Sequence, residues 1–264
     1  MILDEIAEKT RARVERAKQE ISSEEMKRLA EKENAKTGFP FEKELAKKNM
    51  SFICEVKKAS PSKGLIAKDF DYLNIAKEYE EAGAGAISVL TEPDYFLGEL
   101  RYLKEIRKEV SIPLLRKDFT IDEYMIYEAK VAGADIVLLI CALLSKDELK
   151  NYIDICDSLG LSALVEAHDE EEIRMAVSAG ARIIGVNNRN LKDFTVDIHN
   201  GIRLRRQVPE NCFFVAESGI RTREDIVELE KGKVNAVLIG ETLMRSENKK
   251  AMLSELKGVS HAEN

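Results

Sequence analysis

The chain has 264 residues, of which 44% are apolar and 34% are charged, and its formal net charge is -7. This length allows one large domain with an ample core, and the excess of acidic residues disfavours a nucleic-acid partner. No apolar run approaches the roughly 20 residues that a membrane-spanning helix needs, so we expect no membrane partner. The acidic start, with Asp4, Glu5 and Glu8, does not resemble a secretory signal.

The first 48 residues differ in pattern from the rest of the chain. Apolar residues at helical spacing predict two helices here, one through Ile2, Leu3 and Ile6 and one through Met26 and Ala30. We expect residues 1–48 to form a helical extension packed on a catalytic domain of residues 49–264, although a solvated coiled arm is an alternative. The pattern leaves open which end of that domain the extension covers.

Eight short aliphatic runs follow, and each is typical of a strand covered on both faces. They are Ser51–Val56, Ala86–Leu90, Ile112–Leu115, Asp135–Ile140, Ser162–Val165, Arg182–Val186, Cys212–Ala216 and Asn235–Ile239. Amphipathic segments of helical period separate the runs, and one of them has Thr222 as its expected N-cap with Asp225 at the capping-box position. The alternation predicts a parallel sheet, and eight units favour a single (β/α)8 TIM barrel of the α/β class.

Glycines mark the expected ends of several helices. Gly83, Gly133 and Gly180 each lie in an Ala-Gly-Ala string before an aliphatic run, and Gly160 and Gly232 occupy similar places. Glycine adopts positive φ without a Cβ clash, so it can end a helix and turn the chain into the next strand. An open doubly wound sheet is the alternative fold, but the first turn lacks the G-x-G-x-x-G pattern of that class.

Cysteines and histidines show no pattern typical of a metal site. The four cysteines are widely spaced with no C-x-x-C pair, and the histidines are His168, His199 and His261. No zinc site of ordinary spacing can be drawn from them. Most of the cysteines lie in or beside apolar runs, as reduced core cysteines do, so we expect a cytoplasmic protein.

Each aliphatic run ends in polar residues, and these tails hold nearly all of the chemically interesting side chains. They are Glu55-Val56-Lys57, Thr91-Glu92, Arg116-Lys117-Asp118, Ile140-Cys141, Glu166-Ala167-His168, Asn187-Asn188-Arg189, Glu217-Ser218-Gly219 and Gly240-Glu241. In a barrel of parallel strands the carboxyl ends meet at one rim, which is where barrel enzymes place their active sites. The sequence therefore predicts one pocket lined by these tails.

The first tail carries a carboxylate and an ammonium that point the same way. Glu55 and Lys57 are two residues apart on a strand, and buried charges of this kind must pair or bind a ligand. A structural salt bridge is the simpler alternative. Lys117 and Glu166 follow the third and fifth runs, and together they can form a proton donor and acceptor, although each alone is also typical of a solvated surface residue.

The last three tails suit an anionic ligand. Arg189 can grip a carboxylate with its two-pronged guanidinium. The turns at Gly219 and Gly240 expose backbone N–H groups at helix starts, after the seventh and eighth strands, where barrels bind phosphate. Two glycine turns alone are weak evidence, and their position on these two strands strengthens the prediction.

Taken together, these residues resemble the indole-3-glycerol phosphate synthase family. The matching strings are Glu55-Val56-Lys57-Lys58-Ala59-Ser60-Pro61-Ser62, Leu90-Thr91-Glu92 with Tyr95-Phe96, Arg116-Lys117-Asp118-Phe119, Leu164-Val165-Glu166, Asn187-Asn188-Arg189-Asn190-Leu191, Ala216-Glu217-Ser218-Gly219-Ile220 and Leu238-Ile239-Gly240-Glu241. The first and fifth strings are specific, whereas the A-E-S-G-I string is shared with other phosphate-binding barrels. The likeness covers roughly residues 50 to 245.

The resemblance implies a carboxy-lyase that converts 1-(2-carboxyphenylamino)-1-deoxyribulose 5-phosphate into indole-3-glycerol phosphate, carbon dioxide and water, with no metal or organic cofactor. It matches Lys117 to the acid that protonates the ketone and Glu166 to the acid/base of dehydration. Lys57 matches a second lysine that binds the carboxylate or shares the acid role, and the choice between the two lysines stays open. Glu55, Asn187 and Ser218 complete the implied catalytic set.

The resemblance also implies how the substrate is held. Ser60, Arg189 and Glu217 would contact its polar groups. The aromatic ring would be sandwiched by an apolar set, namely Pro61, Phe96, Phe119, Leu138 and Leu191. Gly219, Gly240 and Glu241 would bind the phosphate through backbone N–H groups. The chain is expected to act alone or as a homodimer.

Two other functions share the expected phosphate site. A phosphoribosyl isomerase barrel would need a Cys/Asp or Asp/Asp pair. Cys54 lies in the first strand, but Glu55 and Lys57 flank it differently, and no Asp ends the fifth strand. A sugar-phosphate sensor that has lost catalysis would lack the acids, which are present here. We therefore favour the synthase.

Overall fold

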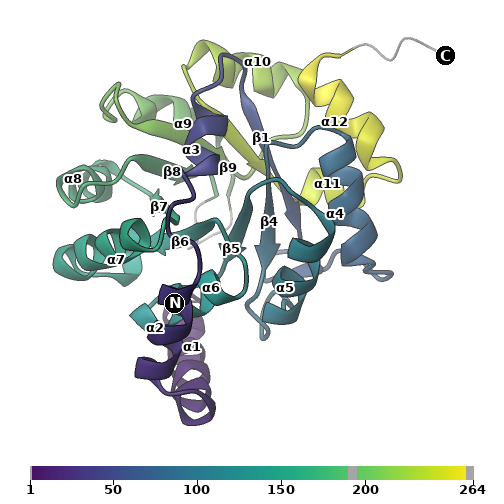
Figure 1. Cartoon of the computed structure of the whole chain (residues 1–264). Coiled ribbons are helices and arrows are strands. Elements are labelled where there is room, and N and C mark those ends of the chain that lie inside the picture. The colour runs from purple at the N-terminus through teal and green to yellow at the C-terminus, as the bar shows by residue number, and fades with distance from the viewer. Residues whose placement is uncertain (1, 190–194, 260–264) are drawn as a thin grey trace.

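The computed structural model describes residues 2–189 and 195–259, and its centre is a closed barrel of eight parallel strands (Figure 1). The order around the barrel is β1-β10-β9-β8-β7-β6-β5-β4. The strands are β1 (Ser51–Val56), β4 (Ala86–Leu90), β5 (Leu114–Lys117), β6 (Ile136–Ile140), β7 (Ser162–Ala167), β8 (Ile183–Asn187), β9 (Phe213–Glu217) and β10 (Ala236–Ile239). The predicted (β/α)8 barrel is thus confirmed.

Helices cover the outside of the barrel between successive strands (Figure 1). They are α4 (Tyr72–Glu81), α5 (Leu100–Glu109), α6 (Glu123–Val131), α7 (Lys146–Ser158), α8 (Glu170–Ser178), α9 (Ile198–Arg205), α10 (Arg223–Lys231), α11 (Glu241–Arg245) and α12 (Lys249–Lys257), with the 3-10 turn η1 (Cys141–Leu143) after β6. The expected capping box of Thr222 and Asp225 is present at the start of α10.

Most of the expected helix-ending glycines have the predicted left-handed conformation. Gly83, Gly133 and Gly180 have φ values of 76°, 88° and 93°. Gly232 is an exception, because it is the C-cap of α10 with φ of -71°, and Lys233 takes the left-handed position with φ of 59°. The prediction for Gly232 was wrong by one residue. In α4, α6 and α8 the C-cap is an alanine and the left-handed glycine follows it, whereas in α10 the C-cap is Gly232 itself.

Several strands end later than expected, and this places polar residues within the strands. β5 was expected at Ile112–Leu115 but begins at Leu114 and reaches Lys117. Proline has no N–H to donate to a sheet, which explains why Pro113 precedes the strand. In β7 and β9 the ladder likewise extends through Glu166 and Glu217. The strand ends, rather than the loops after them, therefore carry these charges.

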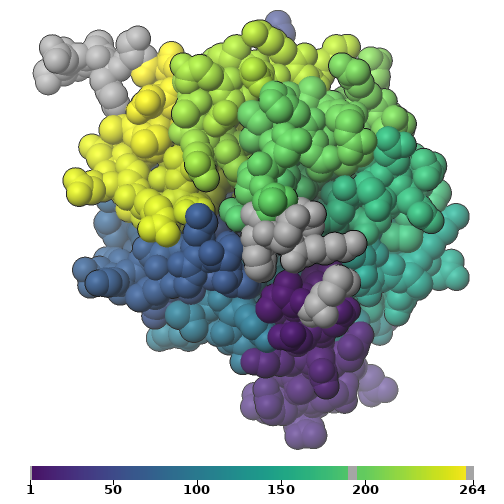
Figure 2. Space-filling view, turned by 180° about the vertical axis from the view of Figure 1, so that it is seen from behind, coloured from purple at the N-terminus to yellow at the C-terminus, as the bar shows by residue number. Residues whose placement is uncertain are grey.

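The N-terminal extension contacts both ends of the barrel. Its helices are α1 (Ile2–Glu20), α2 (Ser23–Lys32) and α3 (Pro40–Leu45). Phe41 and Leu45 of α3 are buried in the cluster of side chains that fills the barrel interior, so α3 closes the amino-terminal end. Helix α1 lies on the opposite face, where Figure 2 shows the purple N-terminal segment. There Ile6 lines the mouth.

A small hairpin follows β1 and was not predicted. Its strands are β2 (Ala59–Ser60) and β3 (Gly64–Leu65), which pair in antiparallel fashion. Ala59 N also donates to Phe96 O at 3.3 Å, which joins this loop to the loop after β4. The hairpin thereby brings Ser60 and Pro61 over the barrel mouth.

Candidate active site

The charged residues at the mouth follow from the two-residue period of the strands. In a barrel, alternate residues of each strand face inward, so the residue two positions after an inner apolar side chain also faces inward, one layer nearer the rim. The inner apolar residues are Ile53, Leu115, Leu164 and Val215, and the residues two positions later are Glu55, Lys117, Glu166 and Glu217. Three carboxylates and an ammonium therefore share one cavity.

This cavity has a volume of about 390 Å³, which suits a small phosphorylated ligand. Every predicted site residue that the structure describes lines it. These residues are Glu55, Lys57, Ser60, Pro61, Phe96, Lys117, Phe119, Leu138, Glu166, Asn187, Arg189, Glu217, Ser218, Gly219, Gly240 and Glu241. Leu191 lies outside the described residues. The predicted convergence on one rim is observed, and the roles assigned to these residues stay predictions.

Lys117 lies between two carboxylates at the centre of the site. Its Nζ is 3.1 Å from Glu217 Oε2 and 3.5 Å from Glu166 Oε2. Burial opposes the charged form of Lys117, but Glu217, Glu166 and Glu55 outweigh it and raise the pKa of the ammonium above its usual value. Lys117 is therefore a charged donor that can be aimed at an oxygen atom of a ligand.

The two carboxylates around Lys117 have pKa values shifted in opposite directions. Burial raises the pKa of Glu166, but Lys117 and His168 outweigh it and lower that pKa well below its usual value. Burial also raises the pKa of Glu217, and here Lys117 compensates only in part, so the pKa stays raised. Neighbouring groups with pKa values pushed apart can serve as base and acid in one reaction.

Glu217 has a buried oxygen without a hydrogen-bond partner among the described residues. Its Oε2 accepts from Lys117, whereas Oε1 has no hydrogen-bond partner among the described residues. A Cβ added at Gly185 on β8, which pairs in register with Val215, would lie 2.4 Å from this oxygen. Because a buried polar atom needs a partner, Oε1 is suited to carrying a proton.

The predicted pair on β1 is present. Lys57 Nζ lies 2.6 Å from Glu55 Oε1, and Ser88 Oγ donates to the other carboxylate oxygen at 3.2 Å. Burial opposes ionisation of Glu55, but Lys57 and Lys117 outweigh it and lower its pKa. Glu55 therefore holds Lys57 as an ammonium that faces the cavity.

One wall of the cavity is apolar. The rings of Phe96 and Phe119 lie 6.0 Å apart with planes inclined by 41°, and Leu138 contributes from β6. Helix α1 adds an apolar patch that the sequence analysis did not assign to the site, made up of Ile2, Leu3 and Ile6. Their helical spacing predicted a buried face, but nothing in the pattern indicated that this face covers the mouth.

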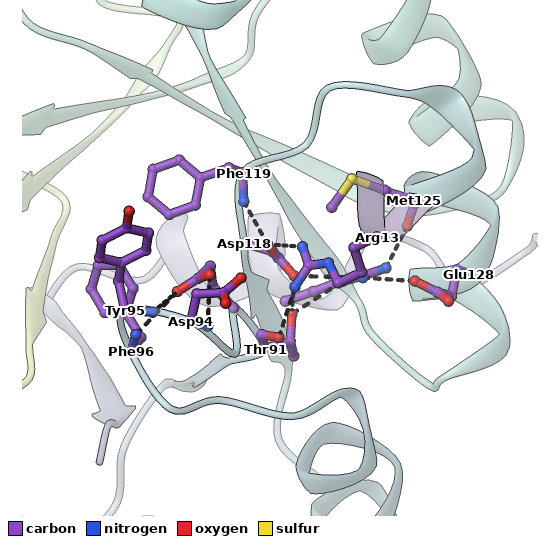
Figure 3. A network of polar contacts seen from close by, with 11 residues as sticks. Arg13, Thr91, Asp94, Tyr95, Phe96, Asp118, Phe119, Met125 and Glu128 are labelled. Atoms are coloured by element: carbon purple, nitrogen blue, oxygen red, sulfur yellow. Dashed lines mark hydrogen bonds and ion pairs between the residues drawn. The ribbon is translucent and has the colours of Figure 1, made fainter. Parts of the chain in front are cut away.

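Helix α1 is tied to the site by buried ion pairs (Figure 3). Arg13 donates to Asp118 Oδ1 at 2.6 Å, and the Thr91 hydroxyl donates to Asp118 Oδ2 at 2.6 Å. Arg116 lies 2.7 Å from Glu128 and 3.6 Å from Asp118 Oδ2. Asp118, which follows Lys117 in the chain, is thus held both by the N-terminal extension and by Thr91, the residue after β4.

Cations gather at the end of the cavity where phosphate binding was predicted. The Glu241 carboxylate lies within 3.8 Å of Lys63, Arg189 and Arg245. Lys63 and Arg245 were missed, because a lysine in a loop and an arginine four residues along a helix are ordinary surface residues in a sequence. Gly219 has φ of +84°, which turns the chain beside this cluster.

The alternative of an isomerase with a reactive cysteine has no support in this geometry. Cys54 faces the outer layer between strands and helices, and burial raises the pKa of its thiol to about 12. It does not line the cavity. A thiol in this position cannot act as the acid or base of the site.

Comparisons with known proteins agree with this site. The family model described as indole-3-glycerol phosphate synthase matches residues 3–256. A curated indole-3-glycerol phosphate synthase from Ruminiclostridium cellulolyticum is 61% identical over 98% of this chain and 99% of its own length. One from Endomicrobium trichonymphae is 58% identical over 97% of this chain and its full length.

Solved structures agree on the fold. A 3-hexulose-6-phosphate synthase from Salmonella typhimurium superposes with a TM-score of 0.64 at 14% identity, over 80% of this chain and 98% of that one. In residues 2–189 and 195–259, no helix combines the length and the apolar character needed to cross a membrane. On the evidence of the matched family model and the near full-length relatives, the chain belongs to the indole-3-glycerol phosphate synthase family.

Proposed function

We propose which residues of this chain carry each step of the family reaction, the conversion of 1-(2-carboxyphenylamino)-1-deoxyribulose 5-phosphate into indole-3-glycerol phosphate, carbon dioxide and water. Membership of the family makes the chain a carbon–carbon carboxy-lyase of tryptophan biosynthesis. The observation that carries the assignment is the position of Lys117, whose ammonium lies within 3.5 Å of two carboxylates inside the cavity.

The substrate fits the cavity in one orientation. Its phosphate meets the cations and the glycine turns at Gly219 and Gly240, and its aromatic ring packs on the wall formed by Phe96 and Phe119. The ketone then lies between these ends, near Lys117. Phosphate binding at a distance from the reacting carbons can hold the substrate bent, with the ring carbon close to the ketone.

Ring closure comes first, with Lys117 as the acid. The ring carbon that bears the carboxylate attacks the ketone carbon, and the ketone oxygen takes a proton from the Lys117 ammonium. Lys117 is preferred to Lys57 because Glu217, whose pKa is raised, lies 3.1 Å away and can return the proton. Lys57 is paired with Glu55, whose pKa is lowered, so we assign Lys57 to the substrate carboxylate.

Decarboxylation and dehydration follow. The bond to the carboxylate breaks, carbon dioxide leaves, and the electron pair restores the aromatic ring. The new hydroxyl then departs as water after receiving a proton, while one proton is lost from the carbon between the nitrogen and the reacting centre. Glu166 is ionised and takes that proton, and Glu217, reprotonated from the solvent after ring closure, supplies the proton for the leaving hydroxyl. The overall reaction consumes one proton, because the substrate carboxylate leaves as neutral carbon dioxide.

Fluorescence tests the assignment directly. The chain contains no tryptophan, so indole emission from the product rises against a low background. Mixing enzyme with the substrate should give this rise together with one carbon dioxide per substrate consumed, and a Lys117→Met variant should bind substrate but show almost none of it. Binding without indole formation by the unaltered chain would instead indicate a sensor.

We also propose that the protein works in the cytoplasm. All four cysteines are free and buried, which is the usual state of cysteines in a reducing compartment. Fractionation of the source cells, with the indole fluorescence assay as the readout, tests this location. Activity in an extracytoplasmic fraction would contradict it.

A further inference from the structure

His168 lies directly behind Glu166 and has no role in the mechanism above. It follows Glu166 by two residues, just after β7 ends at Ala167, and it does not line the cavity. Its Nε2 is 3.2 Å from Glu166 Oε1. The contact has the geometry of an ion pair and not of an in-line hydrogen bond. The other oxygen of Glu166 faces Lys117.

The orientation of the His168 ring is set from its other side. Nδ1 lies 3.0 Å from Glu172 Oε2, and the same oxygen accepts the backbone N–H of His168 at 2.7 Å. Glu172 belongs to the first turn of α8, where Asp169 accepts its N–H at 2.9 Å. Two contacts from a capped helix therefore point Nε2 at Glu166.

These contacts make His168 a cation. Burial opposes its protonation, but its contacts with Glu166 and Glu172 outweigh burial and raise the pKa of His168 to about 10. Other ionisable groups around the cluster are Lys117 on β5 and Glu217 on β9, which face Glu166, and Cys141 of η1, whose thiol contacts the Glu172 carbonyl. The Cys141 thiol stays neutral because burial raises its pKa to about 12.

We propose that His168, fixed by Glu172, is a positioning residue that holds Glu166 as an oriented carboxylate, with one oxygen on the imidazolium and the other directed at Lys117 and the substrate. This inference rests on the proposed function of Glu166 as the base of dehydration. Without the cation, Glu166 has one less group favouring its charged form and can rotate away from the reacting carbon. Dehydration, and not ring closure, should then slow.

A step-resolved measurement tests the proposal with a His168→Gln variant. Single-turnover traces, quenched and separated, should show ring closure near the wild-type rate and dehydration slowed roughly tenfold, less than the 10²–10⁴ expected for loss of an acid/base itself. KM should change little. The acid limb of the dehydration rate should move up by about one to two pH units, because an opposite charge at this distance shifts a carboxylate pKa by that amount.

Two further variants separate positioning from a general loss of structure. Glu172→Gln releases the ring without removing it and should shift the acid limb in the same direction by a smaller amount. His199→Gln is the matched control, since His199 is 70% exposed and pairs only loosely with Glu228 at 3.7 Å. If His168→Gln lowers stability but leaves the acid limb and the ratio of the two steps unchanged, the proposal is overturned.

Failure of the proposed function gives a different result. Glu166→Gln should block dehydration after ring closure. If it dehydrates at the wild-type rate, the assignment of Glu166 is wrong, and the role of His168 falls with it. If Glu166→Gln blocks dehydration while His168→Gln behaves like the control, Glu166 keeps its role and only the inference about His168 is rejected.

Discussion

The Glu55 carboxylate and the Lys57 ammonium, two residues apart on β1, meet at 2.6 Å and lie directly against Gly240. A Cβ added at Gly240 would be 2.4 Å from Glu55 Oε1 and 2.7 Å from Lys57 Nζ. Glycine at this position therefore makes room for the ion pair, in addition to turning the chain into α11.

A Gly240→Ala substitution should displace this pair. We expect kcat/KM to fall by roughly 10², the scale of a displacement of about 1 Å in a catalytic group, while the barrel still folds. Gly180→Ala is the matched control, because nothing lies within 4 Å of its added Cβ but its φ is +93°. It should lower the free energy of unfolding by about 1–2 kcal/mol and leave kcat/KM unchanged. Equal activity of both variants would contradict the packing argument.

The barrel and its ring of charged residues could be predicted because both follow from regular patterns in the sequence. Strand and helix alternate along the chain, and inward-facing residues recur every second position, so Glu55, Lys117 and Glu166 fall on one rim once the sheet closes. The synthase assignment required more than this, since it rested on specific strings such as E-V-K-K-A-S-P-S.

Contacts made between distant segments could not be predicted. The apolar face of α1 was expected to be buried, but its position over the mouth depends on Arg13 meeting Asp118, 105 residues away. The sequence pattern likewise contained no indication that Phe41 packs into the barrel interior from its amino-terminal end. His168 was visible in the sequence only as a histidine after a strand, since Glu172 comes close to it only after α8 has formed.

Substitution of Lys117 should mainly lower kcat, whereas substitution of Lys57 should mainly raise KM. Lys117→Met removes the proposed acid, so we expect kcat to fall by roughly 10²–10⁴ with substrate binding retained. Lys57→Met removes a contact to the substrate carboxylate, so KM should rise more than kcat falls. Steady-state kinetics with a direct binding measurement distinguishes them. The opposite pattern would exchange the roles of the two lysines.

Arg13 should contribute to stability through Asp118. Arg13→Met keeps the apolar stem but leaves the fully buried Asp118 carboxylate without its closest cation. Because the Arg13 side chain is 24% exposed, we expect the lower end of the range for breaking a buried pair, about 3 kcal/mol at pH 7 by chemical denaturation. Lys9→Met, which breaks the exposed pair with Asp94 at 3.4 Å, is the control and should change the free energy of unfolding much less than Arg13→Met does.

The effect of Arg13 should also depend on pH. Burial raises the pKa of Asp118, but Arg13 and Arg116 outweigh it and hold that pKa below its usual 3.8. A carboxylate with a lowered pKa in the folded state adds stability above its unfolded pKa and loses it as the pH falls. The stability difference between wild type and Arg13→Met should therefore narrow below about pH 4. A difference that is constant from pH 7 to pH 3 would rule out the ion pair as its source.

Glu92 should control substrate affinity through the loop that carries Phe96. Its buried carboxylate accepts the backbone N–H groups of Asp94, Tyr95 and Phe96 at 2.9, 2.8 and 3.0 Å. Glu92→Ala removes all three acceptors, so the Phe96 ring loses its fixed position against Phe119, and we expect KM to rise roughly tenfold with a smaller change in kcat.

Glu92→Gln gives a graded test of the same idea. An amide keeps one oxygen acceptor but replaces the other with a donor, so its effect on KM should fall between those of wild type and Glu92→Ala. Product affinity, measured from the indole fluorescence, should follow the same order, because the product ring occupies the same wall. A fall in kcat at constant KM would show that Glu92 acts on the reacting groups and not on the position of Phe96.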